Sequence, residues 1–199
     1  MHRVAVPSTV VAGIWLVARA PAGVDRLGAA IFACGALLMF VASSLVHLRR
    51  WSIPVFEALF RFDHAAIFLL IATSATPVGI SALSGRSATL LLWAVWVGAA
   101  IGVGLRLLPF HPPKGLMNSL FLGLGWVPIL VAPDLFRALE PVTIFLVVVE
   151  GLLYSGGALM LGAQWPDPSP RLFGYHEVWH TFVTAAVAVH FVVVAIVVV

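Results

Sequence analysis

The sequence predicts an all-α integral membrane protein, a seven-transmembrane-helix bundle that forms one domain over residues 1–199. Hydrophobic residues make up 62% of the chain and charged residues 10%, and the mean hydropathy is +1.09. A soluble domain of this size needs far more polar surface to cover its core. The apolar residues also form continuous runs near the ~20 residues that a helical span requires. They do not alternate with polar residues, as the strands of a membrane barrel do.

Seven apolar segments follow one another, separated by clusters of Pro, Gly and charged residues. They are Val4–Val17, Leu27–His47, His64–Ile80, Thr89–Leu108, Met117–Ala132, Pro141–Ala163 and His176–Val199. The first and the fifth are short for a span. We expect short connections, no internal repeat, and a multi-pass protein of a cell membrane, with a bacterial plasma membrane favoured. The sequence does not indicate an oligomeric state.

The first segment admits two interpretations. Arg3, the apolar run after it and the sequence Ala18-Arg19-Ala20 are also typical of a secretory signal peptide with an A-x-A cleavage site. Cleavage would leave six helices. We favour an uncleaved first span, because the later spans can insert without a separate export signal.

The basic residues predict an orientation. If the spans alternate in direction, one side receives seven basic residues: Arg3, Arg49, Arg50, Arg61, Arg106, Lys114 and Arg171. The other side receives four: Arg19, Arg26, Arg86 and Arg137. This bias predicts that the N-terminus is cytoplasmic and the C-terminus lies outside. Membrane topology also accounts for the isoelectric point of 9.8, so we expect membrane lipids, and no nucleic acid, as partners.

Three histidines indicate a metal site. His176 and His180 lie one helical turn apart, which places two imidazoles on the same helix face. His47 ends the second segment, and the alternation of the spans brings it to the same, cytoplasmic face. Three imidazoles on a zinc ion leave a fourth position for water, whose pKa falls to about 7. The single cysteine, Cys34, excludes an intrachain disulfide and a cysteine-based zinc site.

Two further residues at this face suit hydrolysis of an amide or ester in a lipid. Asp63 begins the third segment, where its carboxylate could hold the water and take its proton. Ser43 lies one turn before His47, where its hydroxyl could hydrogen-bond a substrate carbonyl or the developing oxyanion.

Each of these residues also has a purely structural interpretation. His47 could be an interfacial residue, and Ser43 a small residue that packs between helices. Asp63 could be the carboxylate that favours a helix N-terminus. His176 and His180 could mark the water boundary, as tryptophan does. Taken together, five such residues in one layer favour a metal site.

Three ordered motifs resemble those of the hemolysin III family, the bacterial branch of the superfamily that includes the adiponectin and progestin receptors. They are S-x-x-x-H at the end of the second segment, DHAAIFLLIATSATP in the third and HEVWH before the last. LGLGWVPIL and GLLYSGGALM extend the similarity over nearly the whole chain. The resemblance implies a seven-helix bundle with zinc bound by His47, His176 and His180, and with Asp63 and Ser43 around the bound water. The superfamily also includes alkaline ceramidases, which implies a lipid-amide hydrolase with a ceramide-like substrate.

Glu150 departs from this family pattern, because it falls midway along the sixth segment. An ionisable residue at that depth is costly. It either faces a water-filled cavity or stays protonated and hydrogen-bonded inside the bundle. His64 points about 100° away from Asp63 on the helix, so we expect it to lie behind the site or at the interface. His190 lies off the ligand face, so we expect it to be neutral and packed.

Three functions are therefore open. The leading one is a zinc-dependent lipid hydrolase. The second is a receptor-like, lipid-sensing protein in which zinc is structural. The third is a pore or transporter, for which Glu150 is the only favourable residue, since no amphipathic lytic segment is present.

Overall fold

The computed structural model describes residues 2–108, 113, 115–169 and 173–199, with side chains from residue 4 onward. Within them it contains helices and no strand, so the predicted all-α class is confirmed. The helices are α1 (His2–Arg19), α2 (Val24–His47), α3 (Ile53–Pro77), α4 (Gly85–Leu107), α5 (Leu116–Gly125), α6 (Ala132–Ala138), α7 (Pro141–Ala163) and α8 (Tyr175–Val198). A π-helical turn, η1 (Val78–Ala82), follows α3, and a 3-10 turn, η2 (Val127–Val131), joins α5 to α6.

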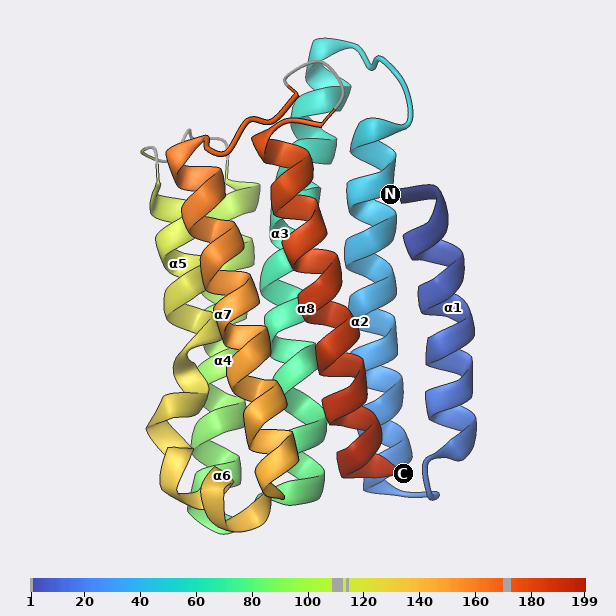
Figure 1. The fold of residues 1–199 in the computed structure, drawn as a ribbon, viewed down its shortest axis with the longest axis vertical. Coiled ribbons are helices and arrows are strands. Elements are labelled where there is room, and N and C mark those ends of the chain that lie inside the picture. The colour runs from blue at the N-terminus through green and yellow to red at the C-terminus, as the bar shows by residue number, and fades with distance from the viewer. Residues whose placement is uncertain (1, 109–112, 114, 170–172) are drawn as a thin grey trace.

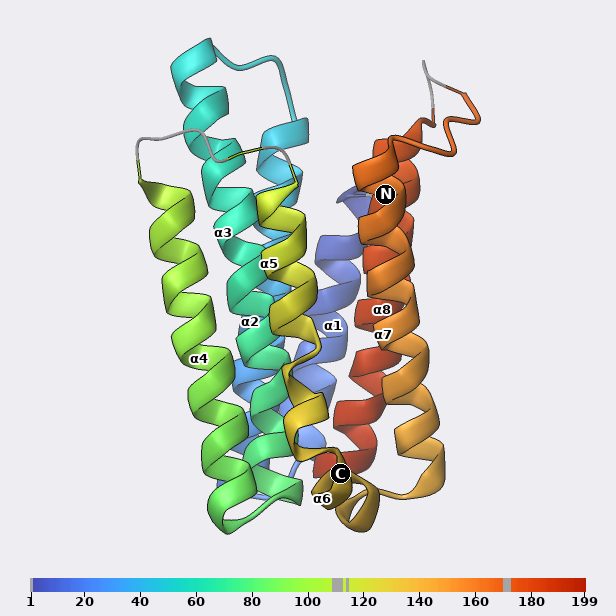
Figure 2. The same ribbon diagram turned by 90° about the vertical axis from the view of Figure 1, so that its left-hand side faces the viewer.

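The long helices lie side by side along one axis (Figure 1). α2 packs against α3, α3 against α4, and α7 against α8, while α1 packs on the outer face of α2. Among the described residues, six helical stretches are long and apolar enough to cross a membrane, and the apolar part of α1, Val4–Arg19, is shorter. The turned view in Figure 2 shows the end of α2, the start of α3, the end of α7 and the start of α8 at the same end of the bundle.

The third span begins earlier than its hydropathy predicts. The predicted start at His64 is wrong, because α3 starts at Ile53 and Asp63 is its eleventh residue. Pro54 lies in the first turn, where a missing N–H costs nothing. The first turns of α3 project beyond the neighbouring helices (Figures 1 and 2). These turns carry charged residues, so a search for apolar runs does not detect them.

The fifth span is interrupted. The segment predicted over Met117–Ala132 extends over Leu116–Ala138, as α5, η2 and α6. Pro128 and Pro133 occupy the first turns of η2 and α6. Because proline has no backbone N–H and clashes with the preceding turn, it starts a helix but does not continue one.

The α7–α8 hairpin depends on one close approach. A Cβ on Gly157 would lie 2.9 Å from the Cβ of Phe182 and 3.0 Å from the ring of Trp179. A glycine at this point lets the two backbones approach as small residues do in membrane helix pairs. The tight contact holds the first turns of α8, which carry His176 and His180, against α7.

Candidate metal centre

His47 from α2 and His176 and His180 from α8 form one cluster. One ring nitrogen from each histidine lies within 4.8 Å of the other two. Nε2 of His176 and Nε2 of His180 are 3.0 Å apart. The ring of His47 lies 5.4 Å from that of His176 and 5.3 Å from that of His180, centroid to centroid. The structure therefore brings together the three histidines that the sequence predicts to share a site.

Local hydrogen bonds position the start of α8. The backbone N–H of Gly174 donates to Oε2 of Glu177 over 2.9 Å, and the N–H of Tyr175 donates to Oδ1 of Asp167 over 3.1 Å. These carboxylates satisfy N–H groups that a helix start leaves without intrahelical partners. These hydrogen bonds fix where α8 begins, and therefore how far along the bundle axis His176 and His180 lie.

The end of α2 is held in a similar way. The indole N–H of Trp51 donates to the carbonyl oxygen of Leu45 over 2.8 Å. Leu45 lies in the last turn of α2, where its carbonyl oxygen otherwise accepts, among the described residues, only a long bond of 3.5 Å from the backbone N–H of Leu48. The guanidinium of Arg49 lies 4.1 Å from the ring centroid of Trp51. The connection therefore folds back on the helix end that carries His47.

The cluster fits a zinc ion. Zn–N bonds of 2.0–2.1 Å in a tetrahedral arrangement separate the ligand nitrogens by about 3.3 Å. The distance of 3.0 Å between Nε2 of His176 and Nε2 of His180 is close to this value, and the 4.8 Å limit leaves only a small closing movement for the third nitrogen. Three neutral imidazoles with no cysteine form the donor set of a zinc site that keeps one position open.

Ser43 lies directly beneath the cluster. Its side chain is only 2% exposed, and its Oγ is buried without a hydrogen-bond partner among the described residues. Ser43 and His180 line the same small cavity, of about 10 Å³, which is the least space that one water molecule needs. A buried hydroxyl without a partner costs free energy, so this one is positioned to bind something that enters the cavity.

Asp63 is not part of the cluster. Its carboxylate is absent from the group of ligand atoms within 4.8 Å, and the charged group that acts on it is Arg106 of α4. Arg106 is itself buried, at 8% exposure, with its guanidinium 5.2 Å from the ring centroid of Phe60. The role of Asp63 in holding a water therefore stays a prediction.

His64 of α3 is not one of the three clustered histidines, although His176 is among the groups that act on it electrostatically. Its Nδ1 hydrogen-bonds the carbonyl oxygen of Phe60 over 2.8 Å, so this nitrogen carries the proton. Its ring packs against Phe60 and Phe121. His111 lies outside the described residues.

The structure also shows a polar pair that the sequence analysis missed. His190 hydrogen-bonds Oε2 of Glu150 through Nδ1 over 2.7 Å and the carbonyl oxygen of Ser74 through Nε2 over 2.9 Å. Glu150 is therefore hydrogen-bonded inside the bundle, one of its two predicted environments, and His190 is packed as predicted. Glu150 and His190 lie nearly the same number of residues before and after the α7–α8 connection. This similar depth in the two helices is the feature of the sequence that could have indicated their contact.

The comparisons with known proteins agree with the motifs. The family model described as "Haemolysin-III related" matches residues 1–191. The chain is 29% identical to "Hemolysin-3 homolog" of Bacillus subtilis (strain 168), over 84% of this chain and 75% of that protein. It is 28% identical to "Hemolysin-3" of Bacillus cereus, over 81% and 70%. No solved structure matches the chain.

A mammalian relative extends the similarity beyond bacteria. The chain is 25% identical to human "Monocyte to macrophage differentiation factor", over 84% of this chain and 68% of that protein. The family match, the bacterial relatives and the apolar helices together show that the chain belongs to the haemolysin III-related family and is a multi-pass membrane protein.

Proposed function

We propose that the protein is a zinc-dependent hydrolase that cleaves an amide or ester bond of a membrane lipid near the cytoplasmic leaflet. The observation that carries the proposal is the cluster of His47, His176 and His180 next to the buried hydroxyl of Ser43, which has no hydrogen-bond partner in the part of the chain that the structure describes. A cluster of ligands alone is compatible with structural zinc. A buried hydrogen-bond donor beside it favours a site that receives a carbonyl group.

The proposed mechanism assigns each residue one task. His47, His176 and His180 would hold a zinc ion, which would supply a water molecule whose pKa is about 7. Ser43 donates a hydrogen bond from Oγ to the substrate carbonyl oxygen and stabilises the charge that develops there. Asp63 would accept a proton from this water as it attacks the carbonyl carbon, and would return the proton to the leaving nitrogen or oxygen. His47 is exposed, which leaves this side of the site open to water.

Metal analysis tests the ligand assignment. Purified wild-type protein should contain about one zinc per chain, and His176→Ala and His180→Ala should lose it, because three imidazoles are the minimum set for this ion. His64→Ala is the matched control, since this histidine lies outside the cluster, and it should keep the metal. Zinc retained by both α8 variants would rule out the site.

Replacing the carboxyl group of Asp63 with a carboxamide tests the proposed role of Asp63 in proton transfer. Asp63→Asn should retain zinc but lower turnover of a ceramide-like substrate by about 10²–10⁴-fold, the usual contribution of a positioned acid–base group. Zinc content and single-turnover rates measure the two effects separately. Wild-type turnover in this variant would remove Asp63 from the mechanism.

A receptor-like protein with structural zinc is the second candidate. The cluster joins α2 to α8, and Asp63 lies outside it and interacts electrostatically with Arg106, as a purely structural site allows. This candidate predicts that His180→Ala lowers thermal stability in detergent while no lipid is ever hydrolysed. Glu150 does not support a pore, because its hydrogen bond to His190 explains why an ionisable residue lies inside the bundle.

A further inference from the structure

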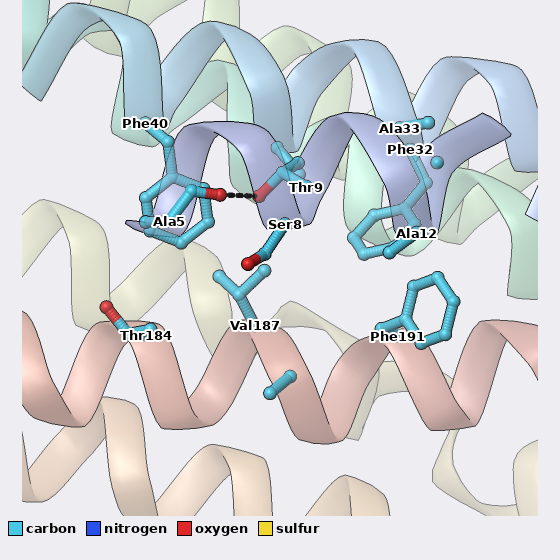
Figure 3. Close-up of a pocket in the computed structure, with 13 residues that line it drawn as sticks. Ala5, Ser8, Thr9, Ala12, Phe32, Ala33, Phe40, Thr184, Val187 and Phe191 are labelled. Atoms are coloured by element: carbon cyan, nitrogen blue, oxygen red, sulfur yellow. Dashed lines mark hydrogen bonds between the residues drawn. The ribbon is translucent and has the colours of Figure 1, made fainter. Parts of the chain in front are cut away.

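An apolar groove runs between α1 and α8, with α2 as its floor. Figure 3 shows Ser8 and Ala12 on α1 opposite Val187 and Phe191 on α8, with Phe32 beside Ala12. The groove has a volume of about 210 Å³, several times the ~30 Å³ share of one water molecule in the liquid. α1 packs on α2 and scarcely meets α8, which keeps the groove open along its length.

The walls of the groove carry few groups that could hydrogen-bond a water molecule. Oγ1 of Thr9 donates to the carbonyl oxygen of Ala5 over 2.8 Å, and Oγ1 of Thr184 donates to that of His180 over 2.7 Å. Both hydroxyl hydrogens are thus used within their own helices. Apart from the hydroxyl of Ser8 the remaining lining side chains are apolar, and a cavity of this kind favours an apolar occupant.

One end of the groove reaches the histidine cluster. Ala5, Phe40 and Thr184 line both the groove and the small cavity that contains Ser43 and His180. Figure 3 shows these three residues at one end of the groove.

From this end the groove runs away from the metal centre. The lining residues of α1 extend from Ala5 to Gly13, which corresponds to about 12 Å along a helix. Phe32 and Phe191 lie at the far end (Figure 3). The result is a small cavity for about one water-sized group, with Ser43 and His180 in its wall, at the head of a narrow apolar channel.

We propose that this groove binds one acyl chain of the substrate lipid and places its carbonyl group at Ser43 and His180. The inference rests on the proposed hydrolase function and names its substrate class, a long-chain N-acyl or O-acyl lipid. A fatty acyl group has this pattern, with a single polar carbonyl at the end of an alkyl chain. The Oγ of Ser43, buried and without a partner, is the donor that such a carbonyl oxygen requires.

Photo-crosslinking tests the groove without requiring turnover. Full-length protein in phosphatidylcholine nanodiscs is irradiated with a ceramide whose acyl chain carries a diazirine, and labelled peptides are mapped by mass spectrometry. We expect adducts on the facing parts of α1, α2 and α8. Ala12→Phe fills the groove, so labelling there should fall about tenfold, which corresponds to a steric penalty of ~1.4 kcal/mol.

Two further variants make the test specific. Ala18→Phe adds the same ring to an exposed position of α1 outside the groove, and its labelling should equal that of the wild type. Ala188→Phe narrows the groove from its exposed rim on α8 and should behave as Ala12→Phe does, even if Ala12→Phe folds poorly. Equal labelling of all four proteins would overturn the inference.

Turnover separates this inference from the proposed function. If the wild type hydrolyses a long-chain lipid and both groove variants do so at the wild-type rate, the groove inference is wrong and the hydrolase stands. If the groove is labelled and blocked as expected but no lipid is cleaved, the acyl-chain site stands and the hydrolase fails.

Discussion

At the scale of single residues, two sets of polar side chains stand out among those buried inside this bundle. Ser43 lies beside the histidine cluster, and Glu150 pairs with His190 deeper in the bundle. Nε2 of His190 must carry a hydrogen, because it faces the carbonyl oxygen of Ser74, which only accepts. One further proton then lies between His190 and Glu150, on either the nitrogen or the carboxyl group. The pair is neutral as a unit in both cases, which lowers the cost of its burial.

Two substitutions at Glu150 test this pairing. Glu150→Leu leaves Nδ1 of His190 without a partner and should destabilise the protein by about 1–3 kcal/mol. Glu150→Gln can donate its amide N–H to Nδ1 of His190 and should lose much less. Thermal unfolding in detergent compares the two variants, and equal losses would show that the hydrogen bond contributes little.

The same pair shows why some of the site could not be predicted. The depth of a residue in a span follows from counting along the chain, and the depths of Glu150 and His190 match. Whether their side chains meet depends on how α7 and α8 are rotated about their axes. That rotation is set by close packing such as the contact of Gly157 with Phe182, and hydropathy does not reveal it.

At the scale of elements, the ends of helices were the hardest feature to predict. The apolar runs locate the parts of helices that lie in hydrocarbon, because only there must side chains be apolar. The early turns of α3 lie beyond that region, and the predicted start at His64 missed them. By contrast, the ends at His47 and Pro141 were predicted correctly.

The α7–α8 contact gives a test at this scale. Gly157→Ala should destabilise the hairpin, because its new Cβ would lie 2.9 Å from the Cβ of Phe182 and both backbones would have to move. The matched control is Gly104→Ala in α4, where a Cβ meets nothing within 4 Å. This change should be neutral or stabilising by up to about 1 kcal/mol. Thermal unfolding of both variants in one detergent measures the difference, and equal effects would contradict the packing argument.

At the scale of the whole molecule, topology was the most informative part of the sequence. Alternating span directions predicted that His47 and the pair on α8 meet at one end of the bundle, and the structure brings them together. The placement of Asp63 did not follow from this reasoning. A side chain that lies at the same end of the bundle need not join the cluster, and Asp63 does not.

The proposed orientation can be tested with fusion proteins. The bias of basic residues places the N-terminus of a seven-span chain in the cytoplasm and the C-terminus outside. Alkaline phosphatase fused to the C-terminus should therefore be active in a bacterial host, and green fluorescent protein at the same position should be dark. The opposite pair of signals would invert the proposed topology and move the histidine cluster to the outer face.

The positions of the three histidines along the chain have a consequence for biogenesis. His47 belongs to α2, whereas His176 and His180 belong to α8, which follows every other described helix. Synthesis proceeds from the N-terminus, so a nascent chain carries an incomplete ligand set until α8 has been inserted. Stalled or truncated chains would not compete for cellular zinc, and zinc occupancy would report that assembly is finished.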